Sequence, residues 1–183
     1  MAIDDASVGR SWARVAANED DWDALYAEQL PRIYNFFRYR VGHGAVAEDL
    51  TSLTFEKAWT ARRRYRRDLG RFSTWLLAIA RNVAVDHWRR HREHAPLEAA
   101  AQVHAGERPD EGAERRSDEE RLGVLLAALP DRERELIALK YGAGLTNRAI
   151  ARQTGLGESN VGTLLHRTVR ALRARWTEGA RDG

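Results

Sequence analysis

Cysteine is absent from this sequence of 183 residues. Its absence excludes disulfide scaffolds, thiolate zinc sites and cysteine nucleophiles, and it fits a reducing compartment. Long hydrophobic runs are also absent: no stretch approaches the roughly 18 apolar residues of a membrane-spanning helix, and the N-terminus lacks the pattern of a signal peptide. The sequence therefore predicts a cytoplasmic protein with no membrane insertion. Its length excludes a large multidomain enzyme.

Lysine is scarce, because only two of the 30 basic residues are lysine and the others are arginine. The net charge of +3 is unevenly distributed along the chain. Residues 61–95 carry 10 basic and 3 acidic groups, residues 96–120 carry 3 and 8, and residues 121–183 carry 11 and 6. Arginine makes bidentate contacts with phosphates and base edges. Two basic blocks around an acidic connector therefore indicate a polyanionic partner.

Strand-like alternation is missing as well, and apolar residues recur at spacings of three and four, which is typical of helices. The three clearest apolar stripes are Tyr26, Leu30, Ile33 and Phe37; Val46, Leu50 and Leu53; and Phe72, Leu76, Ile79 and Val83. Residues 95–120 lack this periodicity and are rich in proline, glycine and acidic residues, as flexible linkers are. The sequence thus predicts an all-α protein of two small helical domains joined by a flexible linker.

The predicted boundaries follow from these patterns. They are an N-terminal extension at 1–23, a helical domain at 24–95, an acidic flexible linker at 96–119, a second helical domain at 120–177 and a C-terminal tail at 178–183.

Residues 146–176 have the pattern of a helix-turn-helix. Thr146 is suited to cap the first helix and Gly155 to end it. The second helix has an apolar face and an opposite polar, cationic face, and such a helix fits the major groove of DNA. The residues predicted to contact DNA through this helix are Ser159, Asn160, Thr163, His166, Arg167 and Arg170. The alternative is an ordinary helical hairpin with a solvated basic face.

The basic block at 61–95 interleaves arginines with aromatic residues. Cations that follow phosphates, beside rings that stack on bases, suit single-stranded or opened DNA better than an intact duplex. For each aromatic residue, packing in the protein core is the competing interpretation.

Three ordered sequence blocks together resemble bacterial extracytoplasmic-function (ECF) sigma factors, the small two-domain initiation subunits of RNA polymerase. The blocks are AEDLTSLTFEKAW at 47–59, FSTWLLAIARNVAVDHWRR at 72–90 and LPDRERELIALKYGAGLTNRAIARQTGL at 129–156. Residues 24–93 resemble sigma region 2, and residues 120–176 resemble sigma region 4.

The resemblance implies three binding surfaces. The first block is similar to the surface that docks on the β′ coiled coil of polymerase, which implicates Asp49, Leu50, Phe55 and Trp59. The second, with the loop before it, is similar to the element that opens the minus-10 promoter region and captures a flipped base. Its implied DNA contacts are Arg64, Arg66, Arg67, Arg71, Trp75, Asn82, Trp88 and Arg89. An amide such as that of Asn82 can read a Watson–Crick edge, although capping or bridging of helices is its alternative role.

The same resemblance implies the partners and the activity. The expected partners are core RNA polymerase, through its β′ coiled coil and β flap, promoter DNA, and an anti-sigma factor. Ser52 stands where many family members have glutamine, and Gly162 and Leu164 stand where lysine and arginine are usual. We therefore expect the role to hold, while the promoter sequence does not carry over from the family.

Other functions are less well supported by the residues. His87, His91 and His94 share one side of a helix at a spacing that can bind metal, but four neighbouring arginines oppose a cation, and we expect no metal site. We find no ordered nucleophile and base, phosphate loop or metal triad, and so expect no catalytic residues, no cofactor and no enzymatic activity. A sigma-like regulator that binds polymerase or an inhibitor without opening DNA remains the alternative function.

Overall fold

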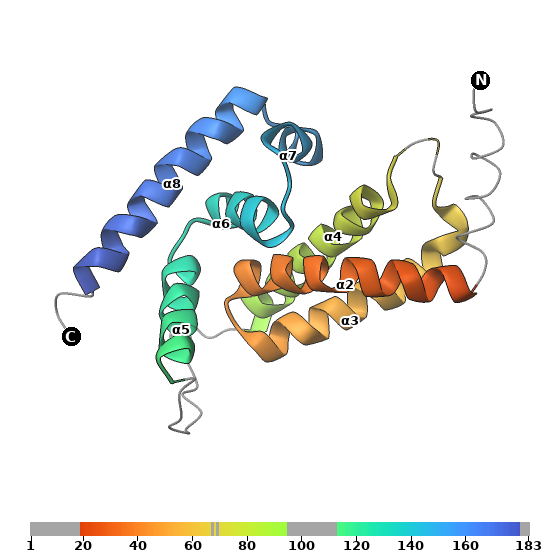
Figure 1. Ribbon diagram of the computed structural model, residues 1–183, viewed down its shortest axis with the longest axis horizontal. Helices are drawn as coiled ribbons and strands as arrows, with labels where there is room; N and C mark the ends of the chain where they lie inside the picture. Colours follow the sequence, from red (N-terminus) through yellow and green to blue (C-terminus); the bar gives the residue numbers. More distant parts are fainter. Residues whose placement is uncertain (1–18, 67, 69, 95–112, 180–183) are drawn as a thin grey trace, which may run out of the picture.

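The structure is a computed structural model that describes residues 19–66, 68, 70–94 and 113–179. Every regular element within these ranges is helical, which confirms the all-α fold class. The helices form two groups, and Figure 1 shows the second group lying across the first.

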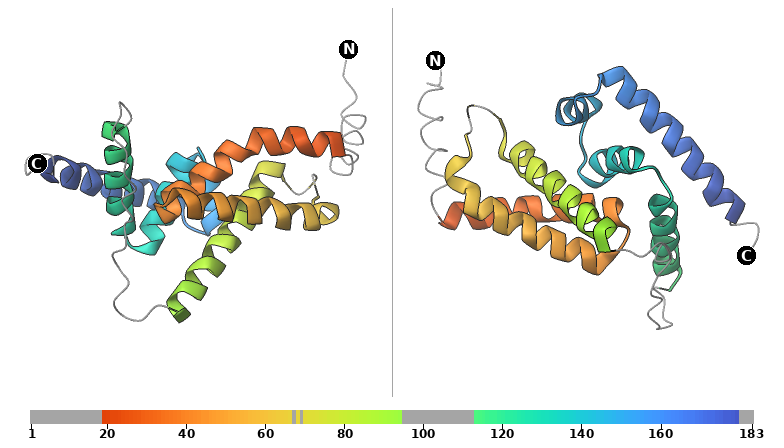
Figure 2. Two further views of the ribbon diagram at one scale, coloured as in Figure 1. Left: turned by 90° about the horizontal axis from the view of Figure 1, so that it is seen from below. Right: turned by 180° about the vertical axis from the view of Figure 1, so that it is seen from behind.

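The first group consists of α2 (Glu19–Val41), α3 (Gly44–Ala61), the short 3₁₀ turn η1 (Arg62–Arg64) and α4 (Phe72–His94). Helices α2 and α3 lie side by side, and α4 packs on both (Figures 1 and 2). Gly42 joins α2 to α3 with φ +75°, a left-handed conformation that glycine adopts without steric cost.

The second group consists of α5 (Ala113–Ala127), α6 (Asp131–Ile137), the π-helical turn η3 (Ala138–Gly142), α7 (Asn147–Thr154) and α8 (Glu158–Gly179). Helix α8 packs on α5, α6 and α7 and forms the outer edge of the group (Figure 1).

Most members of the predicted apolar stripes are buried, because helical spacing places them on one face. Ile33, Phe37, Leu76 and Val83 are all inaccessible or nearly so. Tyr26 is an exception: it is 38% exposed and its ring lies over Phe55, with ring centroids 4.4 Å apart.

The predicted linker was too long at its C-terminal end. Helix α5 begins at Ala113, so residues 113–119 are helical, and Glu119 pairs with Arg38 at 3.2 Å. Alanine, glutamate and arginine favour helix without an apolar stripe, so the helix extends beyond the part that shows periodicity. The rest of the predicted linker, residues 96–112, lies outside the described residues.

Helices also extend past the predicted outer boundaries of the two helical domains. Helix α2 begins at Glu19, within the predicted N-terminal extension, and Trp22 packs edge-on against Trp59 and Phe72. Helix α8 continues to Gly179, within the predicted tail. Residues 1–18 and 180–183 lie outside the described residues.

The two groups of helices share one buried core, which the sequence patterns did not indicate. Ile33 and Phe36 of α2 belong to the same buried cluster as Leu139 of η3 and Leu126 of α5. Helix α2 packs against α3 and α4 of its own group and against α5, α6 and η3 of the other group. Segments far apart in the sequence are therefore held together as one body.

Candidate nucleic-acid and protein interfaces

The predicted helix-turn-helix is present in α7 and α8, with the predicted residues at its caps. The hydroxyl of Thr146 accepts a hydrogen bond from the Ala149 N–H at 3.2 Å, as an N-cap does. Gly155 ends α7 at φ 74°, and its N–H donates to the Ala151 carbonyl at 2.9 Å. Local sequence therefore determines where both ends of α7 lie and how the chain turns into α8.

Helix α8 buries one face and exposes the other, as its periodicity predicts. Val161, Leu165 and Thr168 are buried against the rest of the helix-turn-helix. All six residues predicted to contact DNA through this helix are exposed, namely Ser159, Asn160, Thr163, His166, Arg167 and Arg170. The polar face of α8 is thus open to solvent along its N-terminal half.

Two details of this face bear on its chemistry. Arg167 forms an ion pair with Glu133 of α6 at 2.7 Å, so its guanidinium is already occupied in the free protein. A Cβ added at Gly162 would lie 3.4 Å from the side-chain amide nitrogen of Asn147, at the short end of ordinary van der Waals contact.

A second candidate surface surrounds η1 and the start of α4. Arg64, Arg66 and Arg71 are exposed there, and Arg67 lies outside the described residues. Arg66 pairs with Asp68 through hydrogen bonds of 3.2 and 2.7 Å. The hydrogen bond from Arg66 is the main cause that lowers the pKa of the Asp68 carboxyl. The loop thus presents arginines to solvent on both sides of this ion pair.

The aromatic residues beside this loop form a cluster and are not separate stacking platforms. Tyr65, Phe72 and Trp75 have ring centroids 5.2 to 5.5 Å apart, and the Tyr65 hydroxyl donates to the Gly70 carbonyl at 3.0 Å. Phe72 is buried and Trp75 is half-buried. Core packing, the competing interpretation, holds for Phe72, whereas Trp75 remains partly accessible to solvent.

Asn82 is exposed on α4, and Trp88, further along the same helix, is half-buried. The Arg134 and Arg40 guanidinium carbons lie 5.1 and 5.9 Å from the centre of the Trp88 ring. The indole N–H of Trp88 is buried, with no hydrogen-bond partner among the described residues. The DNA contact predicted for Trp88 stays a prediction, and only part of its ring is accessible to solvent in this arrangement. Arg89 is exposed and lies 3.5 Å from Asp86.

The predicted polymerase-binding residues of α3 divide into buried and exposed ones. Leu50 and Phe55 are 6% and 5% exposed, so their side chains hold α3 on the core. Asp49 is exposed, and Trp59 is half-buried beneath the guanidinium of Arg62 at 3.7 Å. The exposed side of α3 carries Glu48, Asp49, Ser52 and Glu56. Glu48 and Glu56 were not among the predicted residues, although Glu56 lies seven residues after Asp49, a spacing that places both on one side of a helix.

Only part of the histidine stripe lies among the described side chains. His87 is half-buried with its ring edge-on to Trp88, and the side chains of His91 and His94 lie outside the described ones. The described residues contain no group of three or more His, Cys, Asp or Glu side chains arranged to hold a metal ion. None of the described helices is long and apolar enough to cross a membrane.

This geometry defines a helix-turn-helix module packed on a second helical bundle, and comparisons with known proteins agree. Residues 25–94 match Sigma-70 region 2, and residues 119–172 match Sigma-70, region 4. The sigma factor CarQ of Myxococcus xanthus is 33% identical over 85% of this chain and 88% of its own length. The chain belongs to the ECF RNA polymerase sigma factors.

The chain covers a smaller share of the length of some other relatives. The ECF sigma factor BldN of Streptomyces coelicolor is 33% identical over 86% of this chain, and SigF of Caulobacter vibrioides is 34% identical over 57% of it. The chain spans 61% of BldN and 56% of SigF. The fold is similar to that of CnrH in complex with the cytosolic domain of CnrY, with a TM-score of 0.70, 22% identity and coverage of 93% of this chain and 97% of CnrH.

Proposed function

We propose that this chain binds core RNA polymerase, recognises the minus-35 and minus-10 elements of promoters and promotes opening of the DNA. The exposed polar face of α8 carries this proposal, because it stands on a capped helix-turn-helix whose other face is buried. In such a helix the arginines contact phosphates or base edges, and the smaller polar side chains contact bases.

The surfaces on α3 and around η1 are assigned to polymerase binding and to opening of the minus-10 region. The exposed acidic side of α3 binds the β′ coiled coil of polymerase, and the second group of helices binds the β flap. The exposed arginines around η1, with Trp75 and Asn82, hold the opened minus-10 strand, since cations beside aromatic edges suit unpaired bases. The protein works through polymerase in the cytoplasm, and no catalysis of its own is needed.

An anti-sigma factor is a further proposed partner. Support comes from the sigma factor RpoE of Bartonella quintana, whose structure with the anti-sigma factor NepR shares the fold of this chain at a TM-score of 0.65 and 22% identity.

Run-off transcription with purified core polymerase tests the function. Sequencing of genomic DNA crosslinked to the chain first supplies the candidate promoters. Transcription that depends on the chain and on both promoter elements supports the proposal. Polymerase binding without promoter opening would favour the alternative, a sigma-like regulator.

A further inference from the structure

Three buried nitrogen donors lie where α2, α4 and α6 meet. They are Nη1 of Arg40, Nε1 of Trp88 and Nε of Arg134, one from each helix. None of these atoms has a hydrogen-bond partner among the described residues. Because buried polar groups are normally hydrogen-bonded, the three unpaired donors indicate an acceptor that the chain itself does not supply.

The three side chains lie together around one ring. The guanidinium carbon of Arg134 is 5.1 Å from the centre of the Trp88 ring, and that of Arg40 is 5.9 Å from it. Arg40 is only 2% exposed, so water does not screen its charge. The rings of Trp59 and Trp176 each have one guanidinium over them among the described residues, whereas Trp88 has two.

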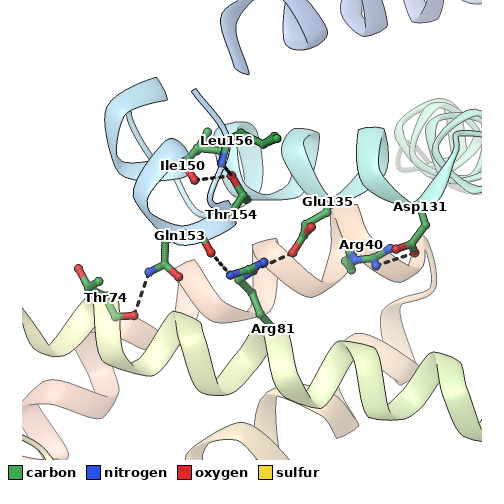
Figure 3. Close-up of polar contacts among 9 residues, drawn as sticks. All are labelled: Arg40, Thr74, Arg81, Asp131, Glu135, Ile150, Gln153, Thr154 and Leu156. Atoms are coloured by element: carbon green, nitrogen blue, oxygen red, sulfur yellow. Dashed lines mark hydrogen bonds and ion pairs between the residues drawn. The ribbon is translucent and has the colours of Figure 1, made fainter. Parts of the chain in front are cut away.

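One carboxylate faces these two guanidinium groups. Asp131 accepts a hydrogen bond from Nη2 of Arg40 at 2.6 Å (Figure 3), and its side chain is 68% exposed. Nη2 of Arg134 donates to the carbonyls of Ala127 and Leu129, which are neutral. Burial and then the charge of nearby Arg40 lower the pKa of Arg134, as expected for two cations held close together.

The other acidic side chains of α6 do not supply the missing negative charge. Glu133 pairs with Arg167 at 2.7 Å. Glu135 pairs with Arg81 at 2.7 Å, as Figure 3 also shows. No ion pair of Arg134 is recorded within the described part of the chain. Two guanidinium groups therefore share one carboxylate, and one positive charge at this junction is not neutralised.

The chemistry of the donors selects the class of ligand. Guanidinium and indole N–H groups donate hydrogen bonds and accept none. A water molecule brings hydrogens that need acceptors of their own, and these three groups offer none. A monovalent anion accepts from all three donors and neutralises the remaining charge. Because the donor atoms are buried, the anion must also be small.

We propose that Arg40, Trp88 and Arg134 form a binding site for a small monovalent anion of the size of chloride. The bound ion joins α2, α4 and α6 and stabilises the folded chain in proportion to its occupancy. It binds more tightly than chloride at the exposed arginines, because opposite charges attract more strongly away from water. The site is independent of the proposed function, since neither DNA nor polymerase takes part in it.

Two substitutions each remove one donor and keep most of the packing. Trp88→Phe removes the indole N–H and keeps an aromatic ring beside both guanidinium groups. Arg134→Met removes one guanidinium and keeps a long unbranched side chain. Trp176→Phe and Arg121→Met are the matched controls, because Arg121 lies over the Trp176 ring at 4.5 Å and neither side chain has a buried donor without a partner.

Chloride-35 NMR measures anion binding directly. Chloride that exchanges between water and a protein site has a broadened line, and bromide displaces it. Sodium gluconate keeps the ionic strength constant. We expect bromide-sensitive broadening in the parent chain and in both controls, and loss of most of it with Trp88→Phe and with Arg134→Met. Equal broadening in every chain would assign the bound chloride to exposed arginines and overturn the proposal.

Urea unfolding measures the stabilisation with a denaturant that carries no charge. At about ten times the chloride Kd found by NMR, binding to the folded chain alone lowers the unfolding equilibrium constant about 11-fold relative to gluconate. We expect this shift in the parent chain and both controls, and little shift with Trp88→Phe or Arg134→Met. The same shift in every chain would be a general salt effect and would refute the site. Circular dichroism checks folding, and if Arg134→Met does not fold, Trp88→Phe carries both measurements.

Discussion

Arg167 and Arg170 share the exposed face of α8, yet their surroundings differ. Arg167 pairs with Glu133 at 2.7 Å, whereas no ion pair of Arg170 is recorded within the part of the chain that the structure describes. Arg167 must exchange a carboxylate for DNA, while Arg170 can bind DNA directly. Single and double substitutions at Arg167, Arg170 and Glu133 should therefore change the affinity for DNA by different amounts.

The expected magnitudes follow from these surroundings. Arg170→Ala should lower the slope of log affinity against log salt by about 0.9 if one phosphate contact is lost, which amounts to roughly 3.5-fold in affinity between 50 and 200 mM salt. Arg167→Ala should also weaken binding. An exposed ion pair is worth about 0.2–1 kcal/mol, so Glu133→Gln should free Arg167 and tighten DNA binding by roughly 1.4-fold to fivefold.

Fluorescence anisotropy on a minus-35 duplex, over a range of salt concentrations, measures all three effects. In the Arg167→Ala background, Glu133→Gln should have no further effect, because the partner it releases is gone. A loss of about 1–3 kcal/mol in binding free energy, with relaxed specificity at one base position only, would identify a base contact instead of a phosphate contact. Unchanged affinity and salt dependence for both arginine variants would refute the assignment of this face to DNA.

Three further predictions concern other elements. Asn82→Ala should bind core polymerase normally but form open complexes poorly on duplex promoters, with partial rescue on a premelted template that removes an unstacking cost of a few kcal/mol; normal promoter melting by potassium permanganate footprinting would contradict this. Phe55→Ala should lower the free energy of unfolding by about 3–5 kcal/mol because it leaves a core cavity. Asp49→Ala should weaken polymerase binding with an unchanged melting temperature. Loss of stability with Asp49→Ala, and loss of polymerase binding without loss of stability with Phe55→Ala, would contradict both assignments. Thr146→Ala should cost about 0.5–2 kcal/mol by removing the cap of α7, and chemical denaturation that shows no loss would disprove the role of this hydrogen bond.

Local features of the fold could be predicted because short-range chemistry determines them. Thr146 and Gly155 define α7 through caps that depend on their own side chain and φ, and the faces of α8 follow from helical periodicity. The six residues predicted to contact DNA are exposed for the same reason. The resemblance assigned Leu50 and Phe55 to polymerase binding without showing that their side chains pack into the core, which depends on the neighbouring helices.

Tertiary structure decided the contacts between segments that are distant in the sequence. Arg81, Glu135 and Gln153 are separated by 54 and 72 residues, and no local pattern pairs them. Likewise, no local pattern places Arg40 and Arg134 over the ring of Trp88. The sequence by itself determined the helices, their caps and the polar face of α8. Only long-range packing decided that the two groups of helices close on each other, because that choice depends on side chains meeting across α2 and α4.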